Sequence, residues 1–89
     1  MAAGNDRALY IVRTGDDHQG FHKGAVAFTD RALADALAGK IKLLIDMNNS
    51  LYDSGLHDNI EPRWIHKGTG VEMMVFADYV HVETVGFVS

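Results

Sequence analysis

The sequence predicts a single α+β domain, residues 1–89, in which one long helix packs on a mostly antiparallel sheet of four to five strands. Three observations support this class. The chain has 89 residues and is 47% apolar, which suits one modest core and is too apolar for a disordered chain. One long segment has helical periodicity, and five short segments have the composition of strands. Their order is strand, strand, helix, strand, strand, strand, and runs of strands around one helix are typical of α+β domains.

Two strands are expected before the helix. Residues 8–13 are apolar on both faces, which predicts a central strand, and residues 24–28 have the composition of its hairpin partner. Between them, residues 14–23 are rich in glycine, aspartate and histidine, as loops are. A loop of about ten residues is long for a hairpin, so we expect a functional loop there. Residues 1–7 are expected to form a loose N-terminal arm.

The helix is expected to begin at Thr29 or Asp30, either of which can act as its N-cap, and to end near Tyr52, with Gly55 as a stop signal. The apolar side chains between these limits fall on one stripe of the helix. They are Leu33, Leu37, Ile41, Leu44, Ile45, Leu51 and Tyr52. Asn48 lies within this stripe, and because an unpartnered buried amide is costly, we expect it to bond to a loop backbone.

Three further strands are expected after a connector, at residues 63–67, 71–77 and 79–88. Gly68-Thr69-Gly70 separates the first two and predicts a hairpin turn, and a tight turn near Asp78 separates the last two.

Composition excludes several classes of function. The chain has 12 acidic and 8 basic residues, and its formal charge of −4 with scattered lysines and arginines argues against direct nucleic-acid binding. It has no cysteine, which excludes disulfides, thiol nucleophiles and thiolate metal sites. No apolar run is long enough for a membrane span or a secretory signal. We therefore expect a soluble, cytoplasmic protein with no membrane partner.

The candidates for catalysis or metal binding are His66, His81 and Glu83. His81 and Glu83 are two apart on a predicted strand and so share a face, and His66 comes from a neighbouring strand. Two imidazoles and a carboxylate can bind a metal ion, but the required strand register is not fixed by the sequence. We therefore assign no catalytic residue, metal or cofactor. A small oligomeric enzyme or ligand-binding protein, with these three residues lining a pocket between subunits, is the alternative hypothesis.

The leading hypothesis is a non-catalytic protein-interaction module, because one helix cannot cover both faces of an apolar sheet and large exposed apolar patches mark interaction surfaces. The predicted surface joins the uncovered sheet face to a second flank of the helix near Gly39. It comprises Trp64, His66, Tyr79, His81, Glu83, Phe87, Leu43 and Met47.

The expected partner is another protein, and a homodimer is expected. The module would act as an adaptor or a stoichiometric inhibitor. One version is a virus-encoded inhibitor that presents carboxylates to a host nucleic-acid machine. The acidic surface would comprise Asp16, Asp17, Asp35, Asp46 and Asp53.

Overall fold

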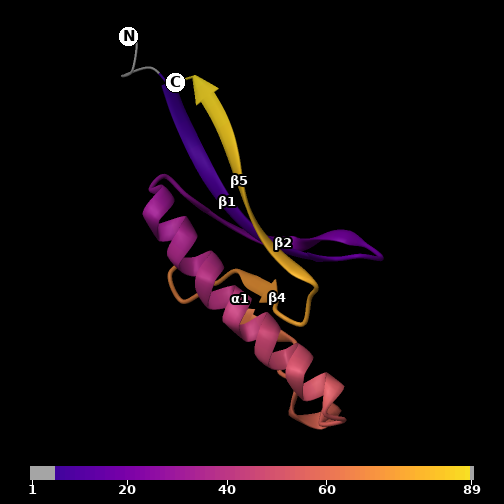
Figure 1. The fold of residues 1–89 in the computed structure, drawn as a ribbon. Coiled ribbons are helices and arrows are strands. Elements are labelled where there is room, and N and C mark those ends of the chain that lie inside the picture. Colours follow the sequence, from indigo (N-terminus) through magenta and orange to yellow (C-terminus); the bar gives the residue numbers. More distant parts are fainter. Residues whose placement is uncertain (1–5, 89) are drawn as a thin grey trace.

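The computed structural model describes residues 6–88 and confirms the α+β class, with one long helix packed on an antiparallel sheet (Figure 1). The elements, in chain order, are β1 (Asp6–Asp16), β2 (Gly20–Phe28), α1 (Arg31–Asp53), the short 3-10 helix η2 (His57–Asn59), β3 (Arg63–Ile65), β4 (Glu72–Met74) and β5 (Tyr79–Val88).

The strands form two sheets, not the single sheet of four to five strands that we predicted. One sheet has the order β2-β1-β5, and β3 and β4 form a separate two-stranded sheet. β1 is central, as its two apolar faces predicted. β4 comes beside β2 at Gly24, where a side chain would overlap the carbonyl oxygen of Glu72. The β1–β2 register shifts between Arg13 and Gly15, next to this approach, and such an irregularity interrupts the regular edge that a further strand would need.

The prediction of a long loop at residues 14–23 is wrong. β1 continues to Asp16 and β2 begins at Gly20, so a short turn joins them. The Asp16 carboxylate accepts hydrogen bonds from the backbone N–H groups of His18 (2.8 Å) and Gln19 (2.6 Å), and Gly20 has a φ of 76°. The polar composition of this segment therefore comes from a tight hairpin end, not from a loop.

The β1–β5 pair forms a long ribbon that extends past the N-terminal end of α1 (Figure 1). Asp6 pairs with Val88 and Arg7 pairs with Phe87, so these two residues belong to β1 and not to a loose arm. The rest of the predicted arm, residues 1–5, lies outside the described residues. The ribbon contributes to an elongated molecule of 55 × 26 × 18 Å.

α1 begins and ends as predicted. The Asp30 side chain accepts a hydrogen bond of 2.8 Å from the Ala32 N–H, which caps the first turn. Gly55, with a φ of 78°, ends the helix through two backbone bonds, Gly55 N–H to the Tyr52 carbonyl (3.0 Å) and Leu56 N–H to the Leu51 carbonyl (2.9 Å). This is the Schellman arrangement, which requires the left-handed conformation that glycine tolerates best.

The core lies between α1, the three-stranded sheet and the β4 segment. Its buried apolar residues are Val12, Val26, Ala34, Leu37, Ile41, Ile45, Met73, Val75 and Ala77. Asn48 is buried as predicted, and its Nδ2 donates to the backbone carbonyls of Glu61 (2.9 Å) and Val75 (3.3 Å). Leu33 and Tyr52, predicted on the buried stripe, are instead exposed. Tyr52 stacks on His57, beyond the end of the core.

Candidate interaction surfaces

Three of the predicted surface residues, Tyr79, His81 and Glu83, lie on the sheet face that turns away from α1. They pair with Gly15, Arg13 and Ile11 of β1, whereas the alternate β1 residues Val12 and Thr14 are buried on the core side. Phe87 pairs with Arg7 in the same ribbon, and its side chain lies outside the part of the chain whose side chains are described.

This outer face is a mixture of aromatic and charged groups. Arg13 forms an ion pair with Glu83 (3.6 Å), and its guanidinium lies 4.9 Å from the centroid of the Phe21 ring. Phe21 also meets Tyr79 edge to face at 5.9 Å and His81 at 5.8 Å between ring centroids. Part of the apolar surface of this face is therefore covered within the chain. We did not predict Phe21 as a member because its segment was assigned to a loop.

Trp64 and His66, predicted as part of the same face, lie instead on the α1 side of the sheet. Trp64 packs against the core, and the His66 ring contacts Trp64 (5.7 Å) and Phe28 (5.9 Å) edge to face, measured between centroids. Within one chain, His66 is thus separated from His81 by the sheet. In residues 6–88 no three histidine, aspartate or glutamate side chains gather in a way that could hold a metal ion.

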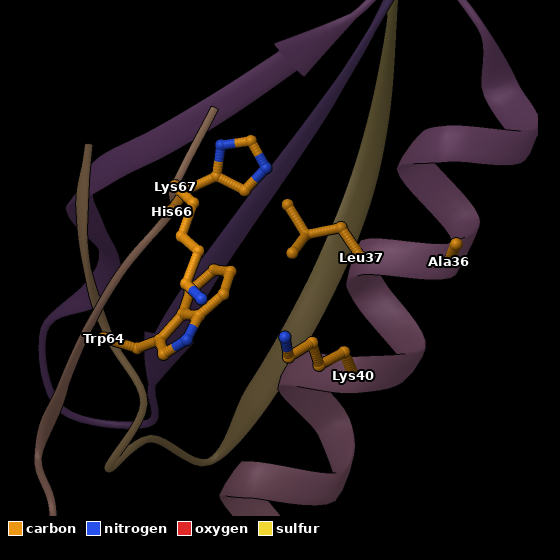
Figure 2. A pocket seen from close by; sticks show the side chains of 6 residues that line it. All are labelled: Ala36, Leu37, Lys40, Trp64, His66 and Lys67. Carbon is orange, nitrogen blue, oxygen red and sulfur yellow. The ribbon is translucent and has the colours of Figure 1, made fainter. Parts of the chain in front are cut away.

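Trp64 and His66 line a pocket of about 340 Å³ between α1 and the turn that follows β3 (Figure 2). Leu37 and Lys40 project from α1 toward the segment that carries Trp64. Lys40 Nζ lies 5.0 Å from the centroid of the indole ring. The remaining lining residues are Ala36, His66 and Lys67. The Gly68-Thr69-Gly70 turn, predicted from sequence, directly follows Lys67, and its Gly70 N–H donates to the His66 carbonyl (2.7 Å).

The second flank of α1 carries the predicted residues Leu43 and Met47. Leu43 is 72% exposed, Leu33 is 55% exposed and Met47 is 52% exposed. Together with Ala36 and Lys40 they follow the spacing 3, 4, 3, 4 along the helix. This spacing places all five side chains on one stripe of the helix surface, which we call the seam. Gly39 lies nearby, and among the described residues no other segment has an atom within 4 Å of where its Cβ would be. We call Leu33, Ala36, Leu43 and Met47 the α1 flank.

The predicted acidic residues fall in two places. Asp35, Asp46 and Asp53 are exposed along α1, and Asp35 pairs with Arg31 at 3.6 Å. Asp17 is exposed in the β1–β2 turn.

The carboxylate of Asp16, also in the hairpin, forms hydrogen bonds within the chain. It accepts a hydrogen bond from His22 Nε2 (2.9 Å) as well as the two turn N–H groups. The hydrogen bond from His22, followed by that from the Gln19 N–H, lowers the pKa of Asp16.

His22 connects Asp16 to Thr14, whose Oγ1 lies 3.0 Å from His22 Nδ1. When the imidazole is neutral and Nε2 donates to the carboxylate, Nδ1 accepts from the Thr14 hydroxyl. The three residue types are those of a nucleophile–base–acid triad. Thr14 is completely buried, however, so its hydroxyl cannot reach a substrate, and the network stabilises the hairpin.

Comparison with known proteins gives no further guide to the site. No family model matches the chain, and neither curated proteins nor solved structures gave a match. In the described part of the chain, no helix is both long and apolar enough to cross a membrane.

Proposed function

We propose that this chain is a non-catalytic protein-interaction module that binds another protein through the α1 flank. The observation that carries the proposal is the exposure of Leu33, Leu43 and Met47, each more than half accessible, on one side of a helix whose opposite side is buried in the core. Burying a leucine or methionine side chain contributes about 1.5–3 kcal/mol, so a partner that covers all three gains a substantial part of its affinity there.

The spacing of the seam indicates what kind of surface suits it. Apolar side chains repeated every three and four residues pack against another helix by inserting between its side chains. The seam contains one charged residue, Lys40, and its ammonium group is held toward Trp64 at the edge of the seam. A helix of another protein, including α1 of a second copy, is therefore the partner that we propose.

The acidic side chains of α1 support an adaptor or stoichiometric-inhibitor role. Asp46 and Asp53 are exposed on the same helix as the flank, and neither forms an ion pair within residues 6–88. A partner bound along α1 would meet these carboxylates at its margin, where charge mainly governs orientation and association rate. These carboxylates would suit a partner with a basic surface. In that case the chain would act as a virus-encoded inhibitor of a host nucleic-acid machine.

The test compares Leu43→Glu with Lys42→Glu. Both changes place a glutamate at an exposed position of α1, but Lys42 lies about 100° further round the helix and off the flank. Light scattering after size-exclusion chromatography gives the mass of each protein. For a homodimer, we expect the dimer mass for the wild type and Lys42→Glu, and the monomer mass for Leu43→Glu.

If the wild type is a monomer, the same three proteins are used to capture partners from cells of the source organism. A partner retained by the wild type and Lys42→Glu but lost by Leu43→Glu supports the proposal. Equal behaviour of the two variants in both measurements, with thermal unfolding showing that each is folded, would overturn it.

A further inference from the structure

We infer that the pocket beside Trp64 binds a planar aromatic group that carries an anionic substituent, either a phosphate or a carboxylate. This inference does not rest on the proposed function, because it concerns a pocket formed with β3 and a different class of ligand, although Ala36 belongs to both surfaces.

The pocket has a suitable size and an apolar wall. Its volume of about 340 Å³ lies at the lower end of the range of small-molecule sites, about 300–1,000 Å³. Leu37 and Ala36 line it from α1, and the half-buried indole of Trp64 lines it from β3. An aromatic ring placed there would contact aliphatic and aromatic side chains, and an offset or edge-to-face contact with the indole is the arrangement that ring pairs prefer.

The charged groups of the pocket all have the same sign. Its titratable lining residues are Lys40, Lys67 and His66, and no carboxylate lines it, although the whole chain has a formal charge of −4. In the described part of the chain, the ion pairs of carboxylates with lysine or arginine all use arginines, and neither lysine of the pocket takes part in one. Two ammonium groups therefore converge on one pocket without a counterion from the side chains of residues 7–86.

His66 adds a directed donor. Its Nδ1 lies 3.1 Å from Thr69 Oγ1, and that oxygen also accepts a hydrogen bond from the Val71 N–H (3.2 Å). In the tautomer in which the Thr69 hydroxyl donates to Nδ1, the ring proton is on Nε2. Nε2 faces α1 (Figure 2), where the anionic group would lie. The turn that positions this ring is tight, since a Cβ at Gly68 would lie 2.9 Å from His66 Cε1.

These contacts define the ligand's two parts. The anionic group lies between the two lysines and His66 Nε2, where phosphate and carboxylate oxygens accept charge-assisted hydrogen bonds. The ring lies against Leu37 and Trp64. Lys40 Nζ already lies 5.0 Å from the indole centroid, so the ammonium is held at the junction of the two parts.

Trp64 provides the readout, because it is the only tryptophan in the chain and lines the pocket. Indole fluorescence is followed during titration of the full chain with phenyl phosphate, benzoate, inorganic phosphate and benzamidine. We expect saturable changes with phenyl phosphate or benzoate, at least about tenfold tighter than with inorganic phosphate, which lacks the ring, or benzamidine, which carries the opposite charge. The order of phenyl phosphate and benzoate identifies which anion the pocket prefers.

The variants Lys40→Gln and Lys67→Gln should each weaken binding of the better probe by about fivefold or more, and Lys42→Gln, which removes the same charge outside the pocket, should leave it within twofold. Two results would overturn the inference: no preference for the aromatic anions, or equal affinities for the three lysine variants. Leu43→Glu should bind the probe as the wild type does. A failure of the proposed function can therefore be distinguished from a failure of this inference.

Discussion

Replacing Asn48 with alanine should lower the free energy of unfolding by about 2–4 kcal/mol. The side chain is 1% exposed and donates two hydrogen bonds, to the carbonyls of Glu61 and Val75. Each buried hydrogen bond is worth about 1 kcal/mol, and each carbonyl left without a donor, together with the vacated space, adds to the loss. For a domain of this size the change corresponds to a fall in melting temperature of at least about 8 °C.

Asn48→Asp separates the hydrogen bonds from the cavity. Aspartate has nearly the same shape, but its carboxylate cannot donate to two carbonyl oxygens and would be buried among acceptors. We expect it to destabilise the fold at least as much as alanine does. Asn49→Ala, at the next position of α1, is the control and should stay within about 0.5 kcal/mol of the wild type. Urea unfolding followed by circular dichroism measures all three. Wild-type stability in Asn48→Asp would refute the role of Asn48 as an anchor between helix and connector.

Three other predictions use the same unfolding assay. Gly39→Ala should stabilise the isolated chain by about 1 kcal/mol, since the site is open and alanine favours the helix; a loss of stability would contradict the open geometry. Gly24→Ala should destabilise the fold by about 1–3 kcal/mol, because its Cβ would overlap the Glu72 carbonyl, and an unchanged unfolding midpoint would show that β4 does not approach β2 there. The lowered pKa of Asp16 means that the unfolded state binds more protons than the folded state in acid. The stability from this carboxylate should therefore be complete above the ordinary aspartate range and be lost as the pH falls through the lowered pKa. Asp16→Asn should flatten that part of the pH profile, and an unchanged profile would count against the His22 contact.

The helix and its anchor were predictable because their signals are local. An N-cap at Asp30, a glycine at position 55 and apolar residues at helical spacing define α1 without reference to the rest of the chain. Asn48 could be predicted to bond to a loop backbone because burial of an amide requires a partner. The hairpin turn at Gly68-Thr69-Gly70 was equally local. The exposure of Leu33 was not predicted, because helical periodicity shows which side of the helix faces the core but not how wide a part of that side the sheet covers.

The arrangement of the strands was less predictable because pairing depends on distant residues. Asp16 satisfies the backbone of a tight turn, and without that contact residues 14–23 have the composition of a loop. Trp64 and His66 were placed on the outer sheet face because strand alternation cannot say to which sheet a short strand belongs. The pocket beside Trp64 brings α1 together with the turn after β3, and only the tertiary fold reveals that its titratable lining residues are all cationic or donor groups.

The pairing of Asp6 with Val88 has a consequence for how the chain acquires its structure. The central strand β1 meets one neighbour within a hairpin but its other neighbour only from the far end of the sequence. Contacts between such distant segments are slow to form, because a long stretch of chain must be ordered first. During synthesis on the ribosome, the hairpin and helix can assemble early, while β1 keeps an open edge until β5 has emerged. A circular permutant that links β5 to β1 and opens the turn between Asp17 and Gln19 would make the β1–β5 pairing local and the β1–β2 pairing distant, and we expect the order in which these two pairings form to reverse.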